Sequence, residues 1–155
     1  MACDKLPRDR EPKWKSWFTT KVEKLAMPDP NCSANVVVKN NAATVADISI
    51  CHYIGGDSTV TSKTWKGVQP GATTTDPFVV HYVLHDRNLD YWYCELTTNG
   101  VLYYTVGGSW LQPDKECMLE EADNGQTLAF AASTTEFDMN MPSGGCSTGM
   151  GTGGI

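Results

Sequence analysis

The sequence lacks any run of 18 consecutive apolar residues, and its first residues contain no apolar stretch. A membrane-spanning helix needs about 20 mostly apolar residues. A secretory signal needs an apolar core near the N-terminus. We therefore expect a cytoplasmic protein without a membrane-spanning helix.

Catalytic motifs are also scarce. The chain has only three histidines, His52, His81 and His85, and it has no GxSxG motif. A nucleophilic triad needs a serine or cysteine with a histidine base and an orienting acid, and no such grouping stands out. The C-terminal glycines follow no expected strand and open no expected helix, so they do not form a phosphate-binding loop. We therefore predict that the protein is not an enzyme and needs no cofactor.

Two short patterns contain residue types that bind metals. His81 and His85 would lie about 13 Å apart along a strand, at ~3.3 Å per residue. Asp86, Asn88 and Asp90 alternate oxygen ligands as calcium loops often do, but the glycine and distal glutamate of an EF-hand are missing. Because aspartate and asparagine also form turns, we predict no metal site.

No two of the six cysteines have CxxC spacing, which argues against a zinc site built on thiolates. An even number of cysteines permits a disulfide framework. Without an export signal, however, free thiols are the expectation.

The net charge of −6 is unevenly distributed. Residues 1–26 carry seven basic and four acidic residues, whereas residues 27–155 carry five and fourteen. The acidic body would repel phosphates, so we expect no nucleic-acid partner. The basic segment could contact an anionic surface or lie on its own acidic domain.

The length of 155 residues suits one domain, and composition divides the chain into three parts. Residues 1–30 are a basic, aromatic arm or helix, and residues 31–141 are the folded domain. Residues 142–155 contain six glycines in fourteen positions. They are predicted to be a flexible tail, because they offer little to bury.

The N-terminal segment has apolar residues at helical spacing: Trp14, Trp17, Phe18, Val22 and Leu25. Lysines flank this apolar stripe: Lys13, Lys15, Lys21 and Lys24. One interpretation is an interfacial helix that inserts its rings into a membrane while the lysines meet anionic head groups. The other is a helix or arm that packs on the domain or on a partner.

The middle of the chain is rich in β-type residues, and turn signals recur about every ten residues. This spacing predicts an all-β protein, an antiparallel β-sandwich with a short N-terminal helix or arm. Pro77 places its strand at an edge or a bulge. The expected strands are 34–40, 45–54, 59–66, 74–84, 89–97, 101–107, 116–121 and 126–133.

Asn99-Gly100 predicts a hairpin with a two-residue type I′ turn, in which Thr98 pairs with Val101. One face of this hairpin is expected to be core: Trp92, Cys94, Leu96, Val101, Tyr103 and Thr105. The other face contains Tyr91, Tyr93, Glu95, Leu102, Tyr104 and Val106. Its tyrosines could serve sheet packing alone or a protein interface. Alternatively, Tyr91, Tyr93, Glu95 and Tyr104 could bind a sugar face or a quaternary ammonium group.

Residues 34–107 resemble the PUD family of small β-sandwich proteins. The resemblance rests on "NVVVKNN", "TWKGVQPGATTTDPFVVHY" and "LDYWYCELTTNGVLYY" in this order. It implies a sandwich without a known active site, similar to the aegerolysins, which bind membrane lipids and can join pore-forming partners. It also implies paired assembly, and it brings no catalytic residues.

Three functional hypotheses follow. The first is a non-enzymatic module that binds a lipid or a membrane surface, for which Trp14, Trp17 and Phe18 are the motive. The second is a structural or interaction protein that forms a homo- or hetero-dimer, because a soluble monomer rarely leaves an apolar stripe bare. The third is a carbohydrate-binding lectin that uses the tyrosines as a stacking platform.

Overall fold

The computed structural model describes residues 31–55, 59–84 and 89–153. The prediction of an all-β protein is confirmed, because regular structure in these residues is strand apart from one 3-10 helix, η1 (Glu121–Asp123). The predicted N-terminal helix or arm lies outside the described residues. No helix in the described part is long and apolar enough to cross a membrane. The strands are β1 (Cys32–Asn40), β2 (Ala46–Ile54), β3 (Val60–Val68), β4 (Phe78–Tyr82), β5 (Asp90–Thr98), β6 (Val101–Thr105), β7 (Lys115–Glu116), β8 (Thr127–Ala132), β9 (Glu136–Asn140) and β10 (Cys146–Gly153).

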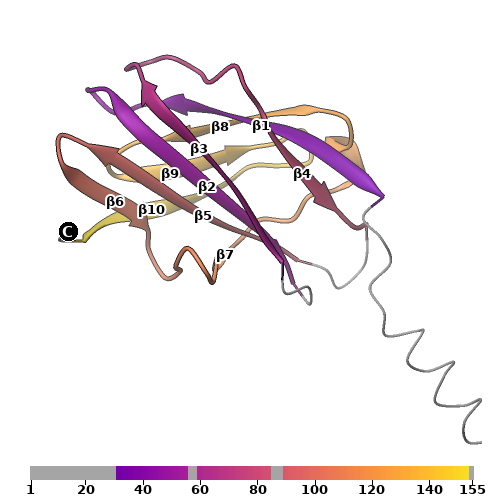
Figure 1. Ribbon diagram of the computed structural model, residues 1–155. Helices are drawn as coiled ribbons and strands as arrows, with labels where there is room; N and C mark the ends of the chain where they lie inside the picture. Colours follow the sequence, from indigo (N-terminus) through magenta and orange to yellow (C-terminus); the bar gives the residue numbers. More distant parts are fainter. Residues whose placement is uncertain (1–30, 56–58, 85–88, 154–155) are drawn as a thin grey trace, which may run out of the picture.

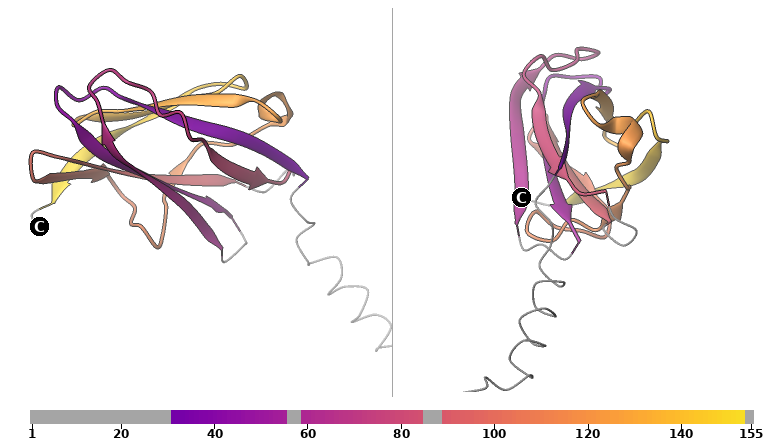
Figure 2. Two further views of the ribbon diagram at one scale, coloured as in Figure 1. Left: turned by 45° about the horizontal axis from the view of Figure 1, so that its top comes forward. Right: turned by 90° about the vertical axis from the view of Figure 1, so that its right-hand side faces the viewer.

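The strands form one continuous sheet in the order β3-β2-β5-β6-β10-β9-β8-β1-β4, and β7 pairs with β5. The sheet folds over into two layers (Figures 1 and 2), one formed by β2, β3, β5 and β6 and the other by β1, β4, β8 and β9. Strand β10 joins the layers, because its first half pairs with β9 and its second half with β6. At the open side, the Trp65 indole N–H of β3 donates to the carbonyl oxygen of Asp76, just before β4, at 2.6 Å.

One strand pair departs from the predicted antiparallel sheet. Strands β1 and β8 run parallel, with Val36 beside Leu128 and Val38 beside Phe130. Parallel neighbours need a long connection rather than a hairpin, and β8 follows β1 only after six other strands. The expectation for Pro77 is confirmed, because β4 begins directly after it and lies at the edge of the sheet.

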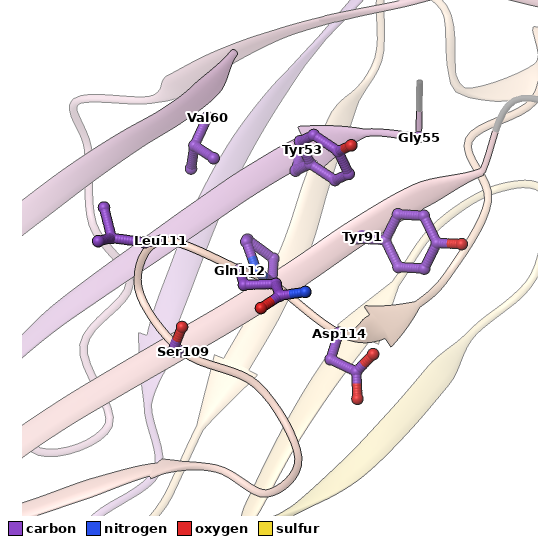
Figure 3. Close-up of a pocket in the computed structure, with 9 residues that line it drawn as sticks. Tyr53, Gly55, Val60, Tyr91, Ser109, Leu111, Gln112 and Asp114 are labelled. Carbon is purple, nitrogen blue, oxygen red and sulfur yellow. The ribbon is translucent and has the colours of Figure 1, made fainter. Parts of the chain in front are cut away.

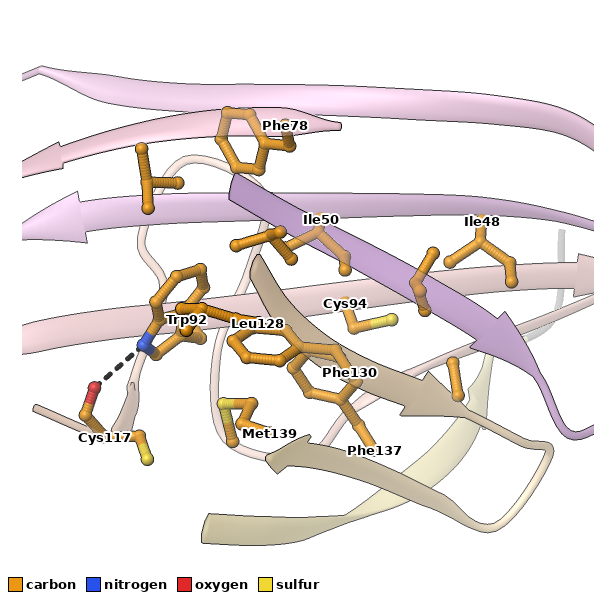
Figure 4. Close-up of a cluster of buried hydrophobic side chains, with 14 of the residues drawn as sticks. Ile48, Ile50, Phe78, Trp92, Cys94, Cys117, Leu128, Phe130, Phe137 and Met139 are labelled. Atoms are coloured by element: carbon orange, nitrogen blue, oxygen red, sulfur yellow. Dashed lines mark hydrogen bonds between the residues drawn. The ribbon is translucent and has the colours of Figure 1, made fainter. Parts of the chain in front are cut away.

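The core lies between the two layers (Figure 4). Trp92 of β5 is fully buried, and its ring centroid lies 5.0 Å from that of Phe130 on β8. Phe130 in turn meets Phe137 of β9 edge to face at 5.8 Å. The buried indole N–H donates to the carbonyl oxygen of Cys117, so Trp92 leaves no unpaired donor in the core.

The β5–β6 hairpin has the predicted turn and register. Asn99 and Gly100 both have positive φ, 51° and 74°, as a type I′ turn requires. Thr98 pairs with Val101, and the predicted partners follow as far as Glu95 and Tyr104. The core face is also as predicted at its centre, where Trp92, Cys94 and Leu96 are completely buried.

The prediction of a flexible tail over residues 142–155 is wrong for Cys146–Gly153. These residues form β10, which lies between β6 and β9. Its glycines have a packing role, since a Cβ on Gly153 would lie 2.8 Å from Cε1 of Tyr104 and one on Gly151 would lie 3.4 Å from Val106. At Gly153 the missing Cβ leaves room for the Tyr104 ring, whereas the contact at Gly151 is an ordinary van der Waals distance.

The expectation of free thiols is wrong for one pair of cysteines. Cys117 and Cys146 form a disulfide, with Cα atoms 6.0 Å apart. The pair comes together because β10 returns beside the segment that follows β7. Cys32, Cys51 and Cys94 are free and buried, as expected for unpaired thiols in a core.

Candidate functional site

The predicted ligand-binding residues lie on the outer face of the β5–β6 hairpin, but among them only Tyr91 lines a hollow. The Tyr93 side chain is 5% exposed. Its hydroxyl donates to Oε1 of Glu95 at 3.1 Å, and Trp110 covers its ring in an edge-on contact with centroids 6.4 Å apart. Burial, reinforced by the Glu95 carboxylate, raises the pKa of Tyr93. Tyr93 therefore contacts both Glu95 and the loop above it, which leaves its ring unable to stack on a ligand.

Tyr104 is also occupied within the fold. It pairs with Glu95 across the hairpin, and its ring lies over Gly153 of β10. An aromatic ring placed over a glycine of the next strand covers backbone that has no side chain of its own. Tyr104 thus protects β10, which explains its position without a ligand.

Tyr91 is the member of the predicted set that lines a hollow. It pairs across the strands with Tyr53 of β2, and the two half-buried rings lie 5.9 Å apart with their planes tilted by 39°. Beside them is an open depression of about 670 Å³. We call it the tyrosine depression (Figure 3), and it is lined by Tyr53, Gly55, Val60, Tyr91, Ser109, Leu111, Gln112, Pro113 and Asp114.

The far wall of the depression is the loop 106–114, which connects β6 to β7. The loop reverses at Ser109 and Gln112, whose backbone N–H groups donate to each other's carbonyl oxygens at 3.0 and 3.1 Å. Gly108 allows the loop to close, because a Cβ there would lie 3.0 Å from the backbone nitrogen of Asp114. Trp110 anchors the loop on Tyr93, and Leu111 at its tip is 84% exposed.

The position of Tyr91 depends on a second glycine. A Cβ on Gly55 would lie 3.0 Å from Cε2 of Tyr91, so a larger residue at position 55 would displace the ring. The Gly55 N–H donates to the carbonyl oxygen of Leu89 at 2.8 Å, which holds the end of β2 against the start of β5. The tyrosine pair is therefore fixed by local backbone contacts.

Besides the two tyrosine hydroxyls, the loop supplies polar groups to the depression. Ser109, Gln112 and Asp114 are all exposed, and together they offer hydroxyl, amide and carboxylate groups. Among the residues that the structure describes, none of those lining the depression is a lysine, arginine or histidine. Sequence reasoning missed Tyr53 and the loop. The alternating burial along β2 puts Tyr53 on the outer face, but only the pairing of β2 with β5 brings it to Tyr91.

A second polar cluster is buried in the core. His52 Nε2 lies 2.6 Å from Asp90 Oδ1, and both side chains are buried. The other oxygen of Asp90 accepts the Leu119 N–H at 2.8 Å, and the His52 ring lies 4.5 Å from that of Trp92. Both carboxylate oxygens of Asp90 are thus engaged in hydrogen bonds within the core. The other two residues of the calcium pattern considered above, Asp86 and Asn88, lie outside the described residues. Within the described ranges no cluster of three ligating side chains could hold a metal ion.

The predicted membrane or partner contacts cannot be placed. All six of these residues lie outside the described part of the chain, so their role stays a prediction: Trp14, Trp17, Phe18, Lys13, Lys15 and Lys21.

Comparisons with known proteins give no family. No family model matches the chain, and no curated protein matches it. Among solved structures, weak likenesses include pneumolysin, described as a sugar-binding protein, with 13% identity and a TM-score of 0.20 over 76% of this chain. Another is the human-specific toxin intermedilysin, with 10% identity and a TM-score of 0.18 over 79% of this chain. The chain spans 23% of the length of each, and TM-scores this low carry no argument about fold or function. The resemblance to the PUD family is untested by these comparisons.

Proposed function

We propose that the chain is a non-enzymatic binding module and that the tyrosine depression is its ligand site. The observation that carries the proposal is the pairing of Tyr53 with Tyr91. Their rings line an open hollow, whereas Tyr93 and Tyr104 on the same sheet face are covered or used for packing. A concave site with aromatic walls and a few polar groups is the usual form of a small-ligand site.

The absence of catalysis is part of the proposal, and the reactive groups of the described residues support it. His52 is enclosed with Asp90, away from solvent. Burial raises the pKa of the Cys51 thiol to about 12, with Glu95 adding to the effect. Burial likewise raises the pKa of Cys94 well above its usual value. A nucleophilic cysteine needs a lowered pKa and access, so neither thiol suits catalysis.

Membrane binding and dimer assembly, the other hypotheses from the sequence, remain proposals. Binding to a lipid or membrane surface through residues 1–30, and assembly as a dimer, both rest on residues outside those described. The cytoplasmic location is also a prediction. The Cys117–Cys146 disulfide argues against the reasoning behind it, since such bonds persist mainly in oxidising compartments.

Ligand-observed NMR with the full chain tests the proposed site. The panel would contain neutral saccharides, choline esters, nucleosides, sugar phosphates and phosphatidylcholine vesicles. We expect at least one class to bind the wild type and to lose its signal in a Tyr53→Ala, Tyr91→Ala double variant. The matched control is Thr75→Ala, an exposed position outside the depression. Binding that persists unchanged in the double variant would move the site elsewhere, and no binding by any class would remove the proposal.

A further inference from the structure

The charge of the tyrosine depression restricts its ligand. The lining residues include the Asp114 carboxylate and no basic side chain. The surrounding domain is itself strongly acidic, with fourteen acidic and five basic residues over positions 27–155. A phosphate, sulfate or carboxylate in this hollow would meet a like charge, and none of the described lining residues offers a positive partner. The ligand class is therefore neutral or cationic.

The hydrogen-bonding side chains of the depression further restrict the class of ligand. Asp114 accepts hydrogen bonds, whereas the Gln112 amide and the Ser109 hydroxyl can both donate and accept. A ligand with several hydroxyl groups satisfies donors and acceptors together. A quaternary ammonium group has neither O–H nor N–H, so it would use the tyrosine rings and the carboxylate but leave the amide and the hydroxyl without partners.

The two rings supply the remaining part of the match. Tyr53 and Tyr91 present adjacent aromatic surfaces whose centroids are 5.9 Å apart. A pyranose ring has a face of C–H groups and a rim of hydroxyls, which matches the tyrosine rings of the strands and the polar side chains of the loop, where Leu111 adds apolar surface (Figure 3). Removing this C–H face and the tyrosine rings from water favours association. The volume of about 670 Å³ falls within the roughly 300–1,000 Å³ of known ligand pockets and exceeds the need of one sugar unit.

We infer that the tyrosine depression binds a neutral saccharide, with Tyr53 and Tyr91 against the C–H face and with Asp114, Gln112 and Ser109 bonded to hydroxyls. The inference rests on the proposed function, whose site it assigns to one ligand class. Trp110 and Tyr93 do not line the depression, and their edge-on contact positions the loop.

The test is a glycan array probed with the full chain, followed by calorimetric titration of the best-binding oligosaccharide. We expect the bound glycans to be neutral. Tyr91→Ala and Asp114→Asn should each weaken binding at least about tenfold, since aromatic and desolvated polar contacts dominate binding sites. Tyr91→Phe should stay within about twofold of the wild type, because it keeps the ring. The matched control is Glu121→Gln, which removes an exposed carboxylate outside the lining, and it should bind as the wild type does.

Other outcomes separate this inference from the proposed function. Binding confined to sialylated or sulfated glycans would overturn the inference, as would neutral-glycan binding that Tyr91→Ala leaves unchanged. If no glycan binds but a choline ester does, and Tyr91→Ala abolishes that binding, the site stands and the saccharide assignment fails. If neither binds, and no other ligand class of the NMR panel loses its signal in the Tyr53→Ala, Tyr91→Ala variant, both fail. Near-ultraviolet circular dichroism of each variant would show that the fold is retained.

Discussion

The ring of Tyr104 on β6 lies across Gly153 on β10, so that a Cβ at position 153 would come within 2.8 Å of the ring carbon Cε1. The ring takes the place of the side chain that glycine lacks, and it shields the paired backbone of both strands. This contact contributes to the order of a glycine-rich strand, because the missing Cβ leaves room for the neighbouring ring. The Tyr104 hydroxyl also lies 3.5 Å from the carbonyl oxygen of Thr152, at the same end of the strand.

We predict that Gly153→Val lowers the free energy of unfolding by about 1–3 kcal/mol, because the added side chain must displace the Tyr104 ring. The measurement is urea unfolding followed by tryptophan fluorescence. Gly149→Val is the matched control, since nothing lies within 4 Å of a Cβ at that position of the same strand. The control should be neutral or slightly stabilising, because valine favours strands and reduces the freedom of the unfolded chain. Equal losses in the two variants would show that the ring contact does not decide the outcome.

The contact also shows why sequence reasoning missed β10. Six glycines in fourteen residues suggest a chain with nothing to bury, and that argument considers the segment alone. What orders β10 is supplied by residues far away in the chain, Tyr104 and Cys117, together with backbone pairing to β6 and β9. Local composition does not contain that information.

The disulfide between Cys117 and Cys146 closes a loop of 29 residues that contains η1, β8 and β9. Restricting an unfolded chain over such a loop stabilises the folded state by about 3–4 kcal/mol in the loop-entropy model. We therefore expect a reducing agent to lower the urea midpoint of the wild type. A Cys117→Ser, Cys146→Ser double variant should resemble the reduced wild type and should not respond to the reducing agent.

A thiol titration of the denatured, non-reduced protein gives an independent check of the bond. The sequence has six cysteines, so one disulfide leaves four reactive thiols at most. A titration that finds all six thiols would contradict the bond. A midpoint that does not move on reduction would contradict its stabilising role.

Asp90 holds two core contacts, one with His52 and one with the Leu119 N–H. Removing one partner of a buried hydrogen bond leaves the other group unsatisfied, at a cost of about 1–3 kcal/mol. We expect Asp90→Leu to lose an amount of this order in urea unfolding. Asp90→Asn should lose less, because an amide oxygen can still accept from Leu119 while the amide N–H donates to the imidazole.

The surface carboxylate of Asp47 gives the control for this prediction. Asp47 bonds to the Gly67 N–H and to Lys66 at the exposed edge of the sheet, and these bonds lower its pKa. Asp47→Asn should therefore cost much less than Asp90→Leu. If Asp90→Asn were as damaging as Asp90→Leu, hydrogen-bond satisfaction would not explain the role of Asp90.

The candidate site was only partly accessible from the sequence. The Asn99-Gly100 turn fixed the hairpin register, and strand alternation then placed Tyr91, Tyr93 and Tyr104 on one face. However, the alternation of side chains along a strand does not indicate which other segment covers that face. Residues 106–114 have no periodic pattern, and their fold over Tyr93 depends on Trp110 finding that ring. Tyr53 and Tyr91 become neighbours only because β2 pairs with β5, and no local sequence signal specifies this long-range pairing.

The buried Tyr93 predicts how stability depends on alkaline pH. Because burial and Glu95 raise the pKa of Tyr93 above its ordinary value of 10.0, the folded protein keeps a proton that the unfolded chain loses. The contribution is thus complete below about pH 10, and stability falls as the pH rises beyond that value, by about 1.4 kcal/mol per pH unit for one group. The free energy of unfolding, measured in urea at several pH values from about 9 to about 11, should fall less steeply in Tyr93→Phe than in the wild type.

The comparison uses the slopes of unfolding free energy against pH, so a uniform loss of stability in the variant does not imitate this effect. Cys51, whose pKa is raised to about 12, adds a parallel decline that is present in both proteins. Identical slopes would show that the Tyr93 hydroxyl is not held protonated under the loop 106–114.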